Sequence, residues 1–127
     1  MKKGDKIYKQ HTDNITWLSK MKFYTDEIKI LKNRLGEIAD KNNRKDVLAN
    51  VEHFQNQLII QKNTIDEISH IINLEEYAIQ KEIIKNPVAI DHREMKSNKE
   101  VKNNVDTFEK NFNELRADFK TFAAKWM

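Results

Sequence analysis

The chain has 127 residues, 39% of them hydrophobic and 34% charged, and its two glycines and one proline are too few for the tight turns of an all-β or α/β fold. Lys and Arg (23) exceed Asp and Glu (20) by only three and alternate with them along the chain, which argues against a nucleic-acid-binding patch. Cysteine is absent, and no apolar run has the length of a signal peptide or membrane span. We therefore expect one cytoplasmic all-α domain over residues 1–127.

The first predicted helix has apolar residues at alternating steps of three and four, which keeps one face of a helix apolar. This first seam comprises Trp17, Met21, Tyr24, Ile28, Leu31, Leu35 and Ile38. Gln10 and Asn14 extend the same spacing toward the N-terminus, so we expect buried amides that set the packing register. Gly36 lies within this helix, and we expect it to permit the close approach of a neighbouring helix.

A wholly polar segment, residues 40–46, predicts a short turn, because Asn and Asp compete with helical hydrogen bonds. A short turn makes the flanking helices antiparallel neighbours. The second seam comprises Val47, Val51, Phe54, Leu58, Gln61, Ile65, Ile68 and Ile72. Within it, the run from His53 to Gln57 surrounds one core position with polar residues, which fits a polar seam, a docking surface or a solvated face.

Residues 73–96 allow two architectures. The Asn-Leu-Glu-Glu sequence at 73–76 has the spacing of a capping box, and in the register of the second seam Glu75 and Glu82 would enter the core. Both observations favour a break here, with a short, irregular third helix in a four-helix, antiparallel up-down bundle. The alternative is a bundle of three long helices, in which the second continues to about Lys85 and the third begins at the following proline.

The last predicted helix follows a second capping-box sequence at residues 97–100. Its seam is rich in aromatic residues and comprises Val101, Val105, Phe108, Phe112, Leu115, Phe119, Phe122 and Trp126. Two-stranded coiled coils prefer branched aliphatic residues at the seam, whereas bulky rings suit the wider centre of a bundle. We therefore expect these rings to form a bundle core and not a ligand site.

One cluster of potential metal ligands emerges if a tight turn lies near Asn73. Residues equally distant from that turn, on the helices before and after it, would then lie side by side. This places His53 level with His92. The carboxylate of Glu94 would lie close to His92. Two histidines and one carboxylate are a workable ligand set for zinc or iron. The alternative is that these residues are partly exposed on the flanks of amphipathic helices, so no cofactor is favoured.

Three segments carry a resemblance to a group of proteins. They are Trp17 to Tyr24, the His53–Gln57 run, and Phe122 to Trp126. In this combination the chain resembles small helical-bundle proteins of Bacteroidetes-type bacteria that have no assigned activity. The resemblance implies a bacterial helical bundle over most of the chain and implies no activity or site residues.

The sequence contains no nucleophile elbow, phosphate-binding glycine loop or dinucleotide fingerprint. The leading hypothesis is therefore a non-enzymatic module for protein–protein interaction or homo-oligomerisation. The first alternative is a metal-binding bundle that uses His53, His92 and Glu94. The second is weak binding of nucleic acid or an anionic surface through Lys2, Lys3, Lys6 and the turn at residues 42–45.

Overall fold

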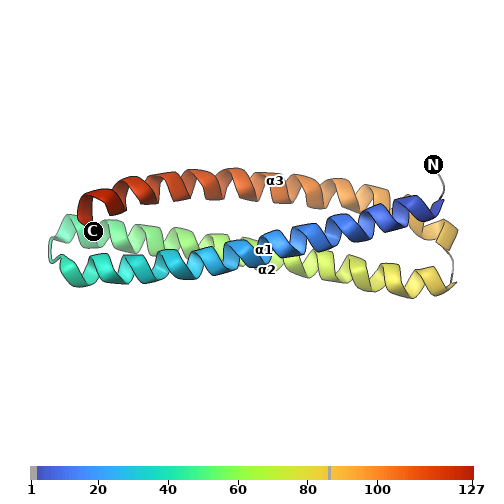
Figure 1. Cartoon of the computed structure of the whole chain (residues 1–127), viewed down its shortest axis with the longest axis horizontal. Helices are drawn as coiled ribbons and strands as arrows, with labels where there is room; N and C mark the ends of the chain where they lie inside the picture. The colour runs from blue at the N-terminus through green and yellow to red at the C-terminus, as the bar shows by residue number, and fades with distance from the viewer. Residues whose placement is uncertain (1–2, 86) are drawn as a thin grey trace.

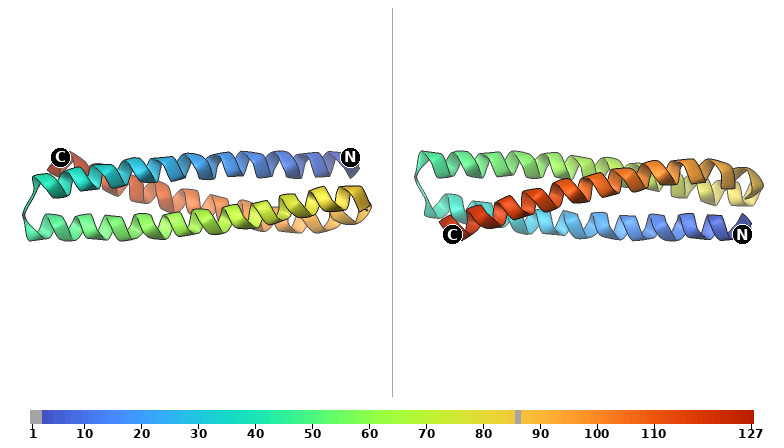
Figure 2. Two further views of the ribbon diagram at one scale, coloured as in Figure 1. Left: turned by 90° about the horizontal axis from the view of Figure 1, so that it is seen from below. Right: turned by 90° about the horizontal axis from the view of Figure 1, so that it is seen from above.

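The computed structural model describes the backbone of residues 3–85 and 87–127 and the side chains of residues 8–81 and 99–127. Over these residues the chain forms three long α-helices and no strand: α1 (Lys3–Lys41), α2 (Lys45–Lys85) and α3 (Pro87–Trp126). The helices pack side by side into a rod, with α1 and α3 running in one direction and α2 in the other (Figures 1 and 2). The all-α antiparallel bundle predicted from the sequence is confirmed.

The prediction of four helices is wrong, because α2 continues without a break through Asn73 to Lys85. The seam of α2 takes one extra step of four residues, from Ile72 to Glu76, before it reaches Ile79. An inserted step of this kind locally unwinds a coiled coil and keeps the inner face directed at its neighbours. The helix therefore tolerates the change of register that suggested a break, and the capping-box sequence lies within it.

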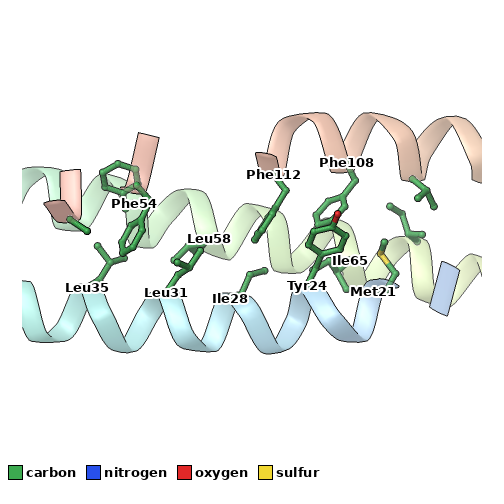
Figure 3. Packing of buried hydrophobic residues seen from close by; sticks show 14 of the residues in the cluster. Met21, Tyr24, Ile28, Leu31, Leu35, Phe54, Leu58, Ile65, Phe108 and Phe112 are labelled. Carbon is green, nitrogen blue, oxygen red and sulfur yellow. The ribbon is translucent and has the colours of Figure 1, made fainter. Parts of the chain in front are cut away.

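Aromatic and aliphatic side chains from all three helices fill the centre of the rod (Figure 3). The Tyr24 ring of α1 lies edge-on to Phe108 and Phe112 of α3, with ring centroids 5.1 and 4.9 Å apart. Phe54 of α2 packs against Phe119 of α3 at 5.7 Å. Most residues of the three predicted seams are buried. Of the aromatic residues of the third seam, Phe108, Phe112 and Phe119 belong to the core as expected, and Phe122 and Trp126 are partly buried against it.

The turn between α1 and α2 spans residues 42–44, where the polar segment predicts it. The Asn42 amide donates to the carbonyl of Ile38 at 2.8 Å and to the carbonyl of Trp126 at 3.2 Å, which ties the turn to the end of α3. Asp46 accepts the backbone N–H of Val47 and the guanidinium of Arg44 near the start of α2. The turn is therefore held by specific hydrogen bonds.

Gly36 does not serve the close helix approach expected from the sequence. It is exposed on α1, and a Cβ added to it would have nothing within 4 Å apart from its local backbone. The neighbouring seam residues Leu35 and Ile38 are both fully buried, so α1 keeps its packed face without help from the glycine. Within the described part of the chain, no helix is long and apolar enough to cross a membrane.

Candidate functional site

The predicted metal site rests on a helix break that the structure does not have. His92 and Glu94 lie outside the residues whose side chains are described, so the ligand set stays a prediction. The uninterrupted α2 removes the reason for placing His92 level with His53. His53 itself is exposed on α2, with its ring edge-on to Phe54 at 5.6 Å. Among the described side chains, no group of three or more His, Asp or Glu residues is arranged to hold a metal ion.

Of the basic residues predicted to bind nucleic acid or anionic surfaces, Lys2 lies outside the described residues, and the others belong to two separate segments of the backbone. Lys3 and Lys6 belong to the first turns of α1, whereas the turn at residues 42–45 lies at the other end of the rod (Figure 1). A 39-residue helix separates them, which corresponds to roughly 58 Å. At that turn Arg44 is paired with Asp46 at 2.8 Å and stacks over the Trp126 ring at 4.8 Å.

A layer of polar side chains crosses the α1–α2 interface near the start of α1. Asn14 donates to Glu76 Oε1 at 2.9 Å, and His11 Nδ1 lies 2.7 Å from Glu76 Oε2. Gln10 Nε2 donates to Asn14 Oδ1 at 3.1 Å and to Glu75 Oε2 at 3.3 Å. Asn14 is fully buried and Glu76 is 9% exposed. Because these groups satisfy one another, the layer fixes the register of α1 on α2 and offers no open ligand site.

A second network joins α1 to α3 around Tyr24. The Tyr24 hydroxyl donates to Glu109 Oε2 at 2.6 Å, and Lys20 donates to Glu109 Oε1 at 3.1 Å. Burial and the hydrogen bond to Glu109 raise the pKa of Tyr24 to about 12. Burial acts to raise the pKa of Glu109, but the hydrogen bonds from Tyr24 and Lys20 outweigh it and hold the pKa below its usual range.

Arg116 of α3 occupies the adjoining level of the same interface. Its guanidinium pairs with Glu27 of α1 at 2.5 Å and lies 5.1 Å from the ring centroid of Phe112. The hydrogen bond to Glu27 raises the pKa of Arg116 further above its ordinary value. These contacts hold the Arg116 guanidinium within the α1–α3 interface, where Glu27 balances its charge.

The interface between α2 and α3 is hollowed at two adjoining places. The first hollow has a volume of about 390 Å³ and is lined by His53, Phe54, Gln57, Gln61, Asn111, Glu114, Leu115 and Asp118. The second has a volume of about 320 Å³ and is lined by Ile60, Gln61, Thr64, Glu67, Ile68, Ile71, Asn104, Thr107, Phe108 and Asn111. Both hollows share Gln61 and Asn111, so they form one continuous groove, which we call the α2–α3 groove.

Gln61 stands out on the floor of the α2–α3 groove. It occupies a seam position of α2 and is only 9% exposed, as the spacing of the second seam predicts. Its amide forms no hydrogen bond with the described residues, in contrast to the satisfied amides of Gln10 and Asn14. Since Gln61 lines both hollows, the groove is the direction from which a hydrogen-bonding partner can reach it.

The rim of the α2–α3 groove combines exposed apolar and acidic side chains. Ile60 is 52% exposed and Ile71 is 39% exposed. Three carboxylates, Glu67, Glu114 and Asp118, line the groove, and none forms an ion pair with the described residues. No Lys or Arg lines either hollow, although the chain as a whole has a formal charge of +3. The groove is therefore a concentration of negative charge on a weakly basic protein.

Comparison of the chain with models of protein families, with curated proteins and with solved structures finds no match. The resemblance to bacterial helical-bundle proteins therefore stays a prediction. The candidate site rests on the geometry of the α2–α3 groove and of the surface residues around it.

The sequence predicts part of this site. The spacing of the second seam includes Gln61, and the His53–Gln57 run fits a polar seam, a docking surface or a solvated face; both His53 and Gln57 line the first hollow. The sequence pattern does not single out Ile60 and Ile71, which lie outside the seam, or the buried Glu76. For Glu76 a signal was present, because Ile72, Glu76 and Ile79 follow steps of four and three.

Proposed function

We propose that this protein is a helical protein–protein interaction module that receives a partner helix in the α2–α3 groove. The role is binding, without a chemical step. The observation that carries the proposal is Gln61, a seam residue only 9% exposed, whose amide opens onto both hollows of the groove and forms no hydrogen bond with the described residues. A bound helix could offer this amide a hydrogen bond in place of the water that reaches it from the groove.

The rim of the groove supports the same role. Ile60 and Ile71 expose apolar surface on both sides of the Gln61 level, and an amphipathic helix laid along the groove would cover them. Three packed helices plus one bound helix give the layout of a four-helix bundle, an arrangement with well-defined packing. The carboxylates along the rim favour an occupant with Lys or Arg beside its apolar face.

Selection of helix-forming peptides from a displayed library tests this proposal and defines the chemistry of the partner helix. We expect peptides with an apolar seam flanked by basic residues to bind the protein and to lose binding when Ile60→Glu is introduced. Ile59→Glu is the matched control, because Ile59 is on the same helix and 48% exposed but does not line the groove. Peptides that bind both variants equally, or no helical binders at all, would contradict the proposal.

A further inference from the structure

The outer side of α1 carries a stripe with the properties that the α2–α3 groove requires. Tyr8, Ile15, Phe23 and Ile30 are 75%, 47%, 62% and 53% exposed, and they recur at steps of seven or eight residues. A seven-residue period keeps such residues on one side of a helix. The stripe from Tyr8 to Ile30 is roughly 33 Å long, and the helix from His53 to Ile71 that lines the groove is roughly 27 Å long. When Ile30 is level with Ile60, Phe23 also lies within the groove, whereas Ile15 and Tyr8 extend along α2 past Ile71.

The stripe is basic where the groove is acidic. Lys22 and Lys29 each precede an exposed apolar residue, Phe23 and Ile30 respectively, and both lysines are exposed and form no ion pair with the described residues. Apart from His53, the ionisable residues that line the groove are all carboxylic acids. Complementary charge of this kind selects a partner and its orientation.

We infer that the occupant of the α2–α3 groove is the α1 stripe of a second copy of this chain. This inference rests on the proposed helix-binding role of the groove. Two grooves cannot face each other in a symmetric dimer without bringing their carboxylates together, which disfavours that arrangement. The stripe and the groove lie on opposite sides of one molecule, so the contact is heterologous and continues from copy to copy into a ring or an open chain.

The positions of the charges fix the register. Phe54 packs on Phe119, and α2 and α3 are antiparallel, so Glu114 lies level with Ile59 and Ile60. Glu67 is therefore seven to eight residues along α2 from the level of Glu114. Lys22 and Lys29 are seven residues apart on α1, so the two spacings match. We place the incoming α1 antiparallel to the α2 that it contacts, as α1 and α2 are within one molecule.

In this register Lys22 lies level with Glu67, and Lys29 lies level with Glu114. Ile30 then lies level with Ile60, which covers the exposed apolar rim of the groove. Asp26, the exposed acid between the two lysines, lies close to the level of Gln61, so its carboxylate can accept the hydrogen bond that the Gln61 amide lacks. The exposed carboxylate of Asp26 thus lies near a hydrogen-bond donor.

Sedimentation of the full chain at increasing concentration, combined with charge reversal, tests the inference. We expect assemblies larger than a dimer for the unmodified chain. The Glu67→Lys, Glu114→Lys variant and the Lys22→Glu, Lys29→Glu variant should each associate at least about tenfold more weakly. An equimolar mixture of the two should associate again, because each stripe then matches the other variant's groove. Circular dichroism of each variant verifies that the helices are intact.

Cysteine pairing tests the register directly, because the chain contains no cysteine of its own. An Ile30→Cys chain with a size tag, mixed with an Ile60→Cys chain under mild oxidation, should give a disulfide-linked heterodimer. Ile71→Cys is the matched control, because it lies eleven residues further along α2, or roughly 16 Å. Equal or preferential linkage to the control would overturn the register.

A monomer at all concentrations, with no restored association in the charge-reversed mixture, would overturn the second copy as the occupant. If helical peptides that depend on Ile60 were still selected from the library, the helix-binding function would stand with a different partner. If neither self-association nor groove-dependent peptide binding were observed, the proposed function would fail as well.

Discussion

The Tyr24 hydroxyl of α1 donates a 2.6 Å hydrogen bond to Glu109 of α3, in a position that also brings the Tyr24 ring against Phe108 and Phe112. One side chain therefore contributes both to the aromatic core and to a charged network at its edge. Hydrogen bonds to a charged acceptor contribute about 1.5–3 kcal/mol when they are well formed. This contact links the stability of the bundle to the protonation of a single tyrosine.

We expect the stability of the bundle to fall between about pH 10 and about pH 12. The pKa of Tyr24 is raised from 10.0 to about 12, so the folded chain retains a proton that the unfolded chain loses. The resulting stabilisation is complete below pH 10 and is lost as the pH rises through 12. Absorbance titration of tyrosinate should show one group with a pKa near 12.

Tyr24→Phe is the control for this assignment, because it removes the hydroxyl and keeps the ring. The late titration should disappear, and the pH dependence above pH 10 should become shallower. The persistence of the late-titrating group in Tyr24→Phe would contradict the role of the Tyr24–Glu109 hydrogen bond.

Gly36→Ala should stabilise the protein by about 1 kcal/mol, since alanine is the better helix former and the added Cβ meets no neighbour. For a domain of this size the melting temperature should rise by about 4 °C. Thermal unfolding followed by circular dichroism measures the change. A loss of stability would show that another helix approaches Gly36 in solution, which is the expectation that the structure contradicts.

Glu76→Ala should destabilise the protein by about 1–3 kcal/mol, because it leaves the fully buried Asn14 amide without its acceptor. The double variant Glu76→Leu, Asn14→Leu should recover much of this loss, since apolar partners at both positions continue the seams on either side. Urea unfolding of the two variants and the unmodified chain provides the comparison. Equal stability of Glu76→Ala and the unmodified chain would show that the layer adds nothing.

Gln61→Leu should stabilise the isolated chain by about 1 kcal/mol, because leucine places more apolar surface than glutamine at a seam position that is only 9% exposed. The same change should weaken binding in the α2–α3 groove, since the donor on its floor is gone. Urea unfolding at low protein concentration, where assembly is minimal, separates the first effect from the second. A destabilised variant would mean that the amide is already satisfied in the free protein.

The sequence predicts the seams well, because a seam depends on residues that are close together in the chain. Whether a residue such as Ile28 or Phe112 lies inside depends mainly on helical periodicity, which successive residues set by themselves. The same reasoning fails at Asn73, where a capping-box sequence lies within a continuous helix. Whether that helix breaks depends on whether the facing α1 offers polar partners for Glu75 and Glu76, and only the packed structure brings Gln10, His11 and Asn14 to that level.

The candidate site likewise combines features that depend on neighbouring residues with features that depend on contacts between distant parts of the chain. The sequence by itself determined that this chain is helical, which faces are apolar, and that Gln61 occupies a seam position. Only the tertiary structure decided that each of the three helices packs against the other two and that Gln61 lines a groove beside several carboxylates. Periodicity acts over a few residues, whereas the pairing of surfaces depends on side chains from distant parts of the chain meeting at one level.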